Sequence, residues 1–153
     1  MNNQPPDRHR ACRHSTYFST HDTYLQQFKA SGFVAYDTLQ IAWPNQDTLL
    51  ICGAIVCSGS IVIDVDKLLE VVPGGTADDP TIRTLRYSYN AHVFGHFNIL
   101  RYDNTHPVGH HSGHDDPHHK HTFSWKTGKE DANSPIWIGA DRWPTLGDVI
   151  SEV

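Results

Sequence analysis

The sequence predicts a single α+β domain, built as a mainly antiparallel twisted sheet of five or six strands with a short C-terminal helix and a His-rich loop at one edge. Three observations lead to this prediction. The chain has 153 residues, which is the length of one domain. Segments in which apolar residues recur at every second position follow one another, separated by turns that contain Gly or Pro. Helical spacing of apolar residues occurs only towards the two ends, as expected if helices cover one face of a sheet.

The N-terminal part of the chain is polar. Residues 1–22 contain Pro5 and Pro6 and show no apolar periodicity, so we expect a flexible arm that precedes a domain of residues 23–153. At the start of this domain, Leu25 and Phe28 have helical spacing before Gly32, which predicts one or two helical turns. An extended lead-in to the first strand fits this short segment nearly as well.

The first half of the sheet is predicted from alternation and from the turns between segments. In residues 33–43, the apolar side chains expected on one face are Phe33, Ala35, Leu39, Ile41 and Trp43. Residues 48–57 are continuously apolar and predict a central strand, paired with the first through the turn at residues 44–47. Residues 61–66 alternate again, whereas residues 67–72 fit either a strand or a helical turn.

The second half begins after a loop at residues 73–80. A hairpin is predicted there, from a strand around Tyr87 to a strand at residues 97–104, and residues 136–138 form a short last strand. The C-terminal helix has a clear start, since Thr145 is followed three residues later by Asp148 in a capping-box arrangement. Its apolar residues have the spacing of an amphipathic helix and are Leu146, Val149, Ile150 and Val153.

Composition limits the classes of function. No apolar run is long enough to span a membrane, the N-terminus has no signal-peptide pattern, and three cysteines without a paired motif are typical of a reducing cytoplasm, so we expect a cytoplasmic protein. The formal charge of −5 gives no general basic surface for nucleic acid. Protonation of all twelve histidines would change the charge to +7, so any attraction to RNA would be local and dependent on pH.

Residues 106–121 contain seven of the twelve histidines, and their Pro and Gly residues predict a loop. One interpretation is a site for zinc or another divalent transition metal, because imidazole is the commonest protein ligand for such ions. The candidate metal ligands are His114, His118, His119 and His121. No known zinc-binding spacing is present, and a solvated loop with histidines enriched by chance remains an alternative.

A second interpretation is acid–base cleavage of RNA without a cofactor. Attack by a 2′-hydroxyl needs a base, an acid and cations that hold the phosphate, and histidines can provide the first two near neutral pH. Lys120 and Arg101 could provide the cations. Alternation predicts that Arg101 and Asp103 share a face with Phe97 and Ile99, and two charges on an otherwise apolar face need each other or a ligand.

Several short motifs add a family resemblance. In chain order they are Arg86-Tyr87-Ser88-Tyr89, Arg101-Tyr102-Asp103-Asn104, His106-Pro107, Pro117-His118-His119-Lys120-His121 and a C-terminal Pro-Thr-Leu. Over residues 33–153 the chain resembles the TumE-type toxin family of prokaryotic toxin–antitoxin systems. It departs from the family pattern at Asn90, where a histidine is frequent.

The resemblance implies a cytoplasmic toxin that acts on RNA and is neutralised by a helix-turn-helix antitoxin. The catalytic residues expected by this resemblance are His118, His119, His121, Lys120, Arg101 and Asp103. The expected substrate-binding residues are Tyr87, Tyr89, Tyr102 and His106. The competing hypothesis is a non-catalytic or metal-binding module that inhibits its target by docking.

Overall fold

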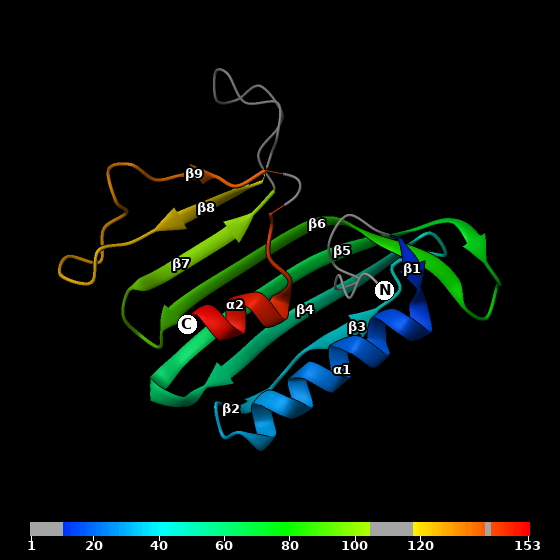
Figure 1. The fold of residues 1–153 in the computed structure, drawn as a ribbon, viewed down its shortest axis with the longest axis horizontal. Coiled ribbons are helices and arrows are strands. Elements are labelled where there is room, and N and C mark those ends of the chain that lie inside the picture. The colour runs from blue at the N-terminus through cyan, green and yellow to red at the C-terminus, as the bar shows by residue number, and fades with distance from the viewer. Residues whose placement is uncertain (1–10, 105–117, 140–141) are drawn as a thin grey trace.

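The computed structural model describes residues 11–104, 118–139 and 142–153 (Figure 1). These residues form a nine-stranded antiparallel sheet in the order β2-β4-β5-β6-β7-β8-β9, with β1 paired to β6 and β3 paired to β4. The strands are β1 (Cys12–Arg13), β2 (Val34–Asp37), β3 (Gln40–Ala42), β4 (Thr48–Cys57), β5 (Ile61–Gly75), β6 (Pro80–Val93), β7 (Asn98–Asp103), β8 (His119–Thr122) and β9 (Ile136–Trp137). The helices are α1 (His14–Ala30) and α2 (Leu146–Glu152), and a 3-10 turn lies at Ser58–Ser60. The predicted α+β class, the antiparallel sheet and the C-terminal helix are confirmed.

Both helices pack on the same face of the sheet, which we call the helix-covered face (Figure 1). Alternate side chains of β4 point to this face, so Ile55 packs with Leu25 of α1 and Ile150 of α2, while Leu49 packs with Tyr17 of α1. Burial of these apolar side chains is the main source of stability for such a layered domain. Within the described residues, no helix is long and apolar enough to cross a bilayer.

The opposite face carries polar side chains, and we call it the polar face. Its polar side chains include Asp64, Asp66, Ser88, Asn90, His92, Arg101, Asp103, His119 and His121. The strand register arranges them in rows, because Asp66 lies opposite Ser88 and Ser88 opposite Asp103. A second row runs from Asp64 through Asn90 to Arg101. The two rows continue into β8, where the predicted histidines lie.

The expected flexible arm is wrong from Cys12 onward. β1 pairs with β6, and α1 starts at His14 and extends for 17 residues, far longer than the predicted one or two turns. The buried residues of α1 are Tyr17, His21 and Leu25, spaced four apart, so a polar histidine lies in the middle of the buried stripe. That histidine hides the apolar periodicity on which the prediction depended.

The predicted strand at residues 33–43 is divided into β2 and β3, with a register shift between Val34 and Tyr36. As a result Val34 is buried, whereas Ile41 and Trp43, expected inside, are 49% and 45% exposed. Gly53 of β4 permits the break, because a Cβ atom there would lie 2.5 Å from the carbonyl oxygen of Thr38. The chain between β2 and β3 can approach β4 closely only at a glycine.

Two other expectations concern the strands of the sheet. Residues 67–72, left open between strand and helical turn, belong to the long strand β5. The predicted His-rich loop is wrong for its last part, since residues 119–121 form strand β8, paired with β7 and β9. The rest of that stretch, residues 105–117, lies outside the described residues.

Candidate functional site

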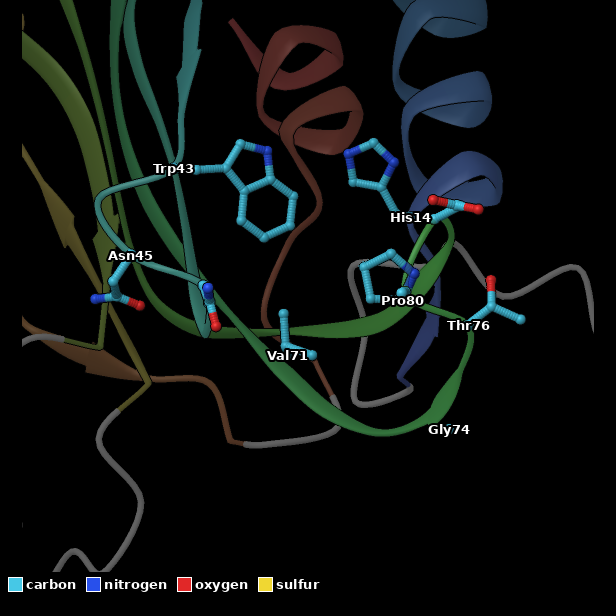
Figure 2. A pocket seen from close by; sticks show the side chains of 10 residues that line it. His14, Trp43, Asn45, Val71, Gly74, Thr76 and Pro80 are labelled. Atoms are coloured by element: carbon cyan, nitrogen blue, oxygen red, sulfur yellow. The ribbon is translucent and has the colours of Figure 1, made fainter.

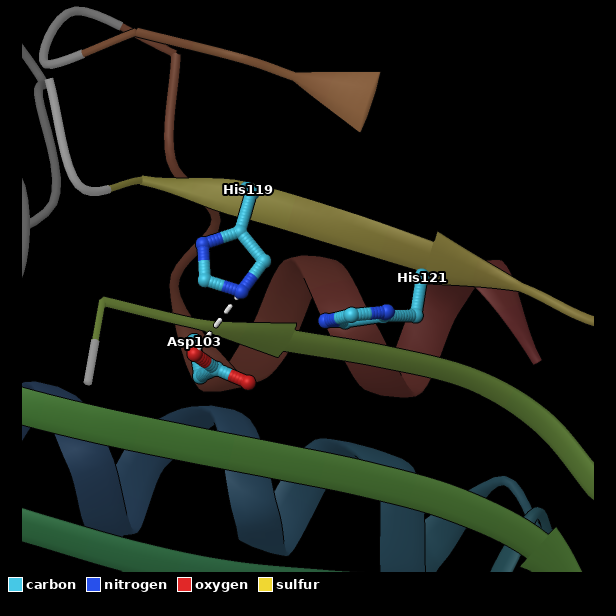
Figure 3. Close-up of side chains that lie close together, drawn as sticks. All are labelled: Asp103, His119 and His121. Atoms are coloured by element: carbon cyan, nitrogen blue, oxygen red, sulfur yellow. Dashed lines mark ion pairs between the residues drawn. The ribbon is translucent and has the colours of Figure 1, made fainter. Parts of the chain in front are cut away.

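The pairing of β7 with β8 brings four of the predicted catalytic residues together. Asp103 lies opposite His119, and Arg101 lies opposite His121. Because residues two apart on a strand share a face, the four side chains form a square on the polar face. Figure 3 shows Asp103, His119 and His121 with both helices behind the strands, so the group lies on the face of the sheet opposite the helices.

Asp103 is the centre of this group. Its Oδ1 lies 3.0 Å from Nε2 of His119, and its Oδ2 lies 2.7 Å from Nε of Arg101. The side chains of Asp103 and His119 are fully buried, whereas that of Arg101 is 42% exposed. A buried carboxylate is costly unless charged or hydrogen-bonding groups surround it, and the guanidinium of Arg101 places a permanent positive charge beside this one. The exposed guanidinium remains within reach of a ligand from solvent.

His121 is held from outside the strand pair. Its Nδ1 lies 2.5 Å from Oε1 of Glu130, which also accepts a hydrogen bond of 2.7 Å from the hydroxyl of Ser134. The hydrogen bond with His121, followed by that with Ser134, holds the pKa of Glu130 below its usual value. Glu130 is therefore ionised near neutral pH and fixes the orientation of the His121 ring.

We call Asp103, His119 and His121 the His/Asp cluster. One potential ligand atom from each residue lies within 4.8 Å of the other two. The two imidazole rings are 4.9 Å apart, and the ring of Trp137 in β9 packs against His119 at 5.3 Å. Imidazole and carboxylate groups arranged in this way can transfer protons or bind a divalent metal ion.

Lys120 lies on the other side of the sheet. Its Nζ contacts Oε1 of Glu152 in α2 and lies 5.1 Å from the ring centre of Tyr102. The predicted pairing of Lys120 with Arg101 around one phosphate is therefore wrong, since alternation along β8 places Lys120 on the helix-covered face.

His118, Tyr87 and Tyr89 are also separated from the cluster. Tyr87 and Tyr89 are fully buried in the core of the helix-covered face. The ring of His118 stacks on Trp143 at 5.3 Å, and its Nδ1 lies 3.0 Å from the hydroxyl of Tyr87. These contacts are those of core packing, so the structure does not bring His118 to His119 and His121.

Two predicted residues, His106 and His114, lie outside the described residues. The predicted metal-ligand set is accordingly revised: His119 and His121 meet, His118 does not join them, and Asp103 completes the group. Sequence reasoning missed Glu130, because its segment shows no periodicity. Glu130 reaches His121 through a short bridge between residues 123 and 130, which no local pattern signals.

Sequence reasoning also missed Lys67, which is buried on the helix-covered face and contacts the hydroxyl of Tyr17. The signal was present, since Lys67 falls between Val65 and Leu69 at an inward position of the alternating strand. The structure assigns this lysine to packing between β5 and α1, on the opposite face from the His/Asp cluster.

A surface pocket of about 950 Å³ lies elsewhere, beside the start of α1 (Figure 2). The rings of His14 and Trp43 stack at 5.8 Å along its wall. Of the described residues that line it, Asp78 is the one with a permanent charge. The described part of its lining therefore lacks the permanent cations expected of a phosphate-binding site.

Comparisons of the chain with known protein families, with curated proteins and with solved structures find no match. The resemblance to TumE-type toxins stays a prediction.

Proposed function

We propose that this protein is the toxin of a toxin–antitoxin pair and that it cleaves RNA at the His/Asp cluster. The observation that carries the proposal is the square of side chains on β7 and β8, in which two imidazoles and a buried carboxylate adjoin the exposed guanidinium of Arg101. Cleavage of a phosphodiester needs a base that takes the proton from the attacking hydroxyl, an acid that gives one to the leaving oxygen, and a cation that stabilises the phosphoryl oxygens.

Arg101 suits the role of the cation. Its guanidinium is permanently charged, partly exposed and oriented by Asp103 through a contact of 2.7 Å. Such a group can donate two parallel hydrogen bonds to a phosphate. The cluster beside it supplies the groups that promote loss of the proton from the nucleophile.

The rest of the polar face is compatible with a polyanion. Its acidic residues Asp64 and Asp66 each lie beside a basic side chain, at 3.0 Å from His92 and 3.3 Å from Arg86. These pairs reduce the repulsion that isolated carboxylates would exert on an RNA backbone. A cytoplasmic location and neutralisation by a helix-turn-helix antitoxin are part of the same proposal and follow from the family resemblance.

The experiment that tests the proposal is cleavage of a labelled single-stranded RNA by the purified full-length chain. We expect cleavage by the wild type, in buffer supplemented with Zn²⁺ or Mn²⁺, and a loss of roughly 10²-fold or more in His121→Ala. His96→Ala is the control, because it removes an exposed histidine in the turn between β6 and β7, away from the cluster. A folded wild type that cuts no RNA, or a His121→Ala variant as active as the control, would refute the proposal.

A further inference from the structure

We infer that Asp103, His119 and His121 bind one divalent transition-metal ion, such as Zn²⁺. This assigns a cofactor to the site of the proposed function, and the role of the metal in RNA cleavage rests on that function. Metal binding itself does not depend on the proposed function. The inference depends on the donor atoms, on the groups that hold them and on their burial.

The donor atoms are close to the spacing that a metal ion requires. Zinc bonds to imidazole nitrogen and carboxylate oxygen are about 2.0 to 2.2 Å long, so neighbouring ligand atoms around the ion lie about 3.4 Å apart. Nε2 of His119 and Oδ1 of Asp103 are 3.0 Å apart, and all three donor atoms lie within 4.8 Å of one another. A shift of the His121 side chain by roughly 1 to 1.5 Å would bring all three donor atoms to this spacing.

The groups around the donors are those that support metal ligands. A histidine that binds a metal through one nitrogen commonly donates the other N–H to a carboxylate, which sets the tautomer and the ring orientation. Nδ1 of His121 has this relationship with Glu130, at 2.5 Å. The second oxygen of Asp103 is likewise held by Arg101 at 2.7 Å. Figure 3 shows the imidazoles and the carboxylate turned toward one another from two adjacent strands.

Burial and charge favour a cation in this place. Asp103 and His119 are fully buried, so water competes weakly for their donor atoms. Asp103 and Glu130 bring two negative charges and Arg101 one positive charge, which leaves the group with a net negative charge before a metal binds. A divalent ion would change that charge from −1 to +1.

The donor set also indicates which metal. Two imidazole nitrogens favour Zn²⁺, Co²⁺, Ni²⁺ or Fe²⁺ over Mg²⁺ and Ca²⁺, which prefer oxygen ligands. Three protein ligands leave one coordination position open, as in catalytic zinc sites. A water molecule or a phosphate oxygen would occupy that position on the polar face, on the same side of the sheet as Arg101.

The test is titration of the full-length chain with Co²⁺, followed by its visible absorption, and then displacement by Zn²⁺. Five histidines outside the described residues could also bind metal, so the reference protein carries His9, His106, His110, His111 and His114 all changed to alanine. In this reference we expect one Co²⁺ per chain. Adding His121→Ala should lower the affinity for Co²⁺ by more than the roughly tenfold to hundredfold typical of losing a residue that only supports a ligand. Adding His92→Ala should leave the affinity unchanged.

Removal of a buried ligand could unfold the chain, so a second variant is needed. His119→Gln keeps an amide that can donate to Asp103, and circular dichroism establishes whether it folds. Loss of Co²⁺ binding in this folded variant would support the inference. Unchanged binding in both His119→Gln and His121→Ala, or no binding by the reference protein, would overturn it. RNA cleavage is measured separately, so a protein that binds the metal and cuts no RNA supports this inference and refutes the proposed function.

Discussion

The hydroxyl of Tyr102, in β7, donates a hydrogen bond of 2.6 Å to Oε2 of Glu152, in α2. Lys120 of β8 contacts the other oxygen of the same carboxylate. One residue of the C-terminal helix is thus tied to two neighbouring strands near the edge of the sheet. On the opposite face, the same two strands carry Asp103 and His119. Contacts on the helix-covered face therefore help to fix the strand pair that carries the site.

Replacing Tyr102 by phenylalanine should lower the free energy of unfolding by about 1 to 2 kcal/mol, because a hydrogen bond to a charged and only partly buried acceptor is lost. The measurement is urea unfolding of wild type and variant at neutral pH. Tyr36→Phe is the matched control, since Tyr36 is 56% exposed, and we expect no measurable change there. Equal stability of all three proteins would contradict the structural role given to Tyr102.

Tyr102 should also affect stability at alkaline pH. Burial, followed by the hydrogen bond to Glu152, raises the pKa of Tyr102 well above its ordinary value. Between the usual tyrosine pKa of about 10 and this raised pKa, the unfolded chain has lost a proton that the folded chain keeps. Stability must then fall as pH rises through this range. Unfolding measured from pH 8 to pH 11 should show a smaller decline in Tyr102→Phe than in the wild type.

Glu130 provides a test of the metal site that leaves its three ligands in place. Glu130→Gln keeps the size of the side chain and removes its charge, so His121 loses its carboxylate partner. Metal affinity should fall by about tenfold to a hundredfold. The control is Glu70→Gln, because Glu70 lies on β5, where it contacts Arg83 of β6 and none of the three cluster residues in the described structure. Matching Co²⁺ affinities in the two variants would remove the supporting role proposed for Glu130.

The sequence predicted those elements whose signals are local. Alternation around Ile63 is enough to predict a strand, because one face of the sheet is buried. Helix α1 was underestimated because His21 lies in its buried stripe and because its start is fixed by Asp79, which is 64 residues from Ser15 in sequence. A contact between residues so far apart leaves no periodic trace near the helix.

The site was predicted only in part, because it too depends on contacts between residues that are distant in the sequence. Asp103 and His119 were both named as candidates, but their contact depends on the register of β7 with β8. The density of Pro and Gly favoured a loop across the entire histidine stretch. Had residues 119–121 been predicted as a strand, alternation alone would have placed Lys120 on the opposite face from His119 and His121.

The capping box of α2 was predicted from sequence and is confirmed. The hydroxyl of Thr145 accepts a hydrogen bond of 3.1 Å from the amide of Asp148, whose carboxylate accepts one of 2.9 Å from the amide of Thr145. Thr145→Ala should lower the free energy of unfolding by about 1 kcal/mol. Thr127→Ala, in a turn with an exposed side chain, is the control for urea unfolding. A loss no larger than that of the control would show that the cap adds nothing to stability.

Asp79 should make the stability of the fold depend on pH in the acid range. Its carboxylate accepts hydrogen bonds of 2.8 Å from both the amide and the hydroxyl of Ser15 at the start of α1, and these bonds lower its pKa. Because the folded-state pKa is depressed, the stabilisation is complete above the unfolded pKa of about 3.9 and is lost as pH falls through the folded value.

Asp79→Asn should therefore unfold at a lower temperature than the wild type at pH 7, with the difference shrinking as pH falls below 4. Asp78→Asn, at the neighbouring exposed position, is the control and should match the wild type throughout. Thermal unfolding followed by circular dichroism provides the measurement. A gap between Asp79→Asn and wild type that stays constant down to pH 2 would mean that Asp79 acts through its shape and not through its charge, and that the pairing with Ser15 does not depend on ionisation.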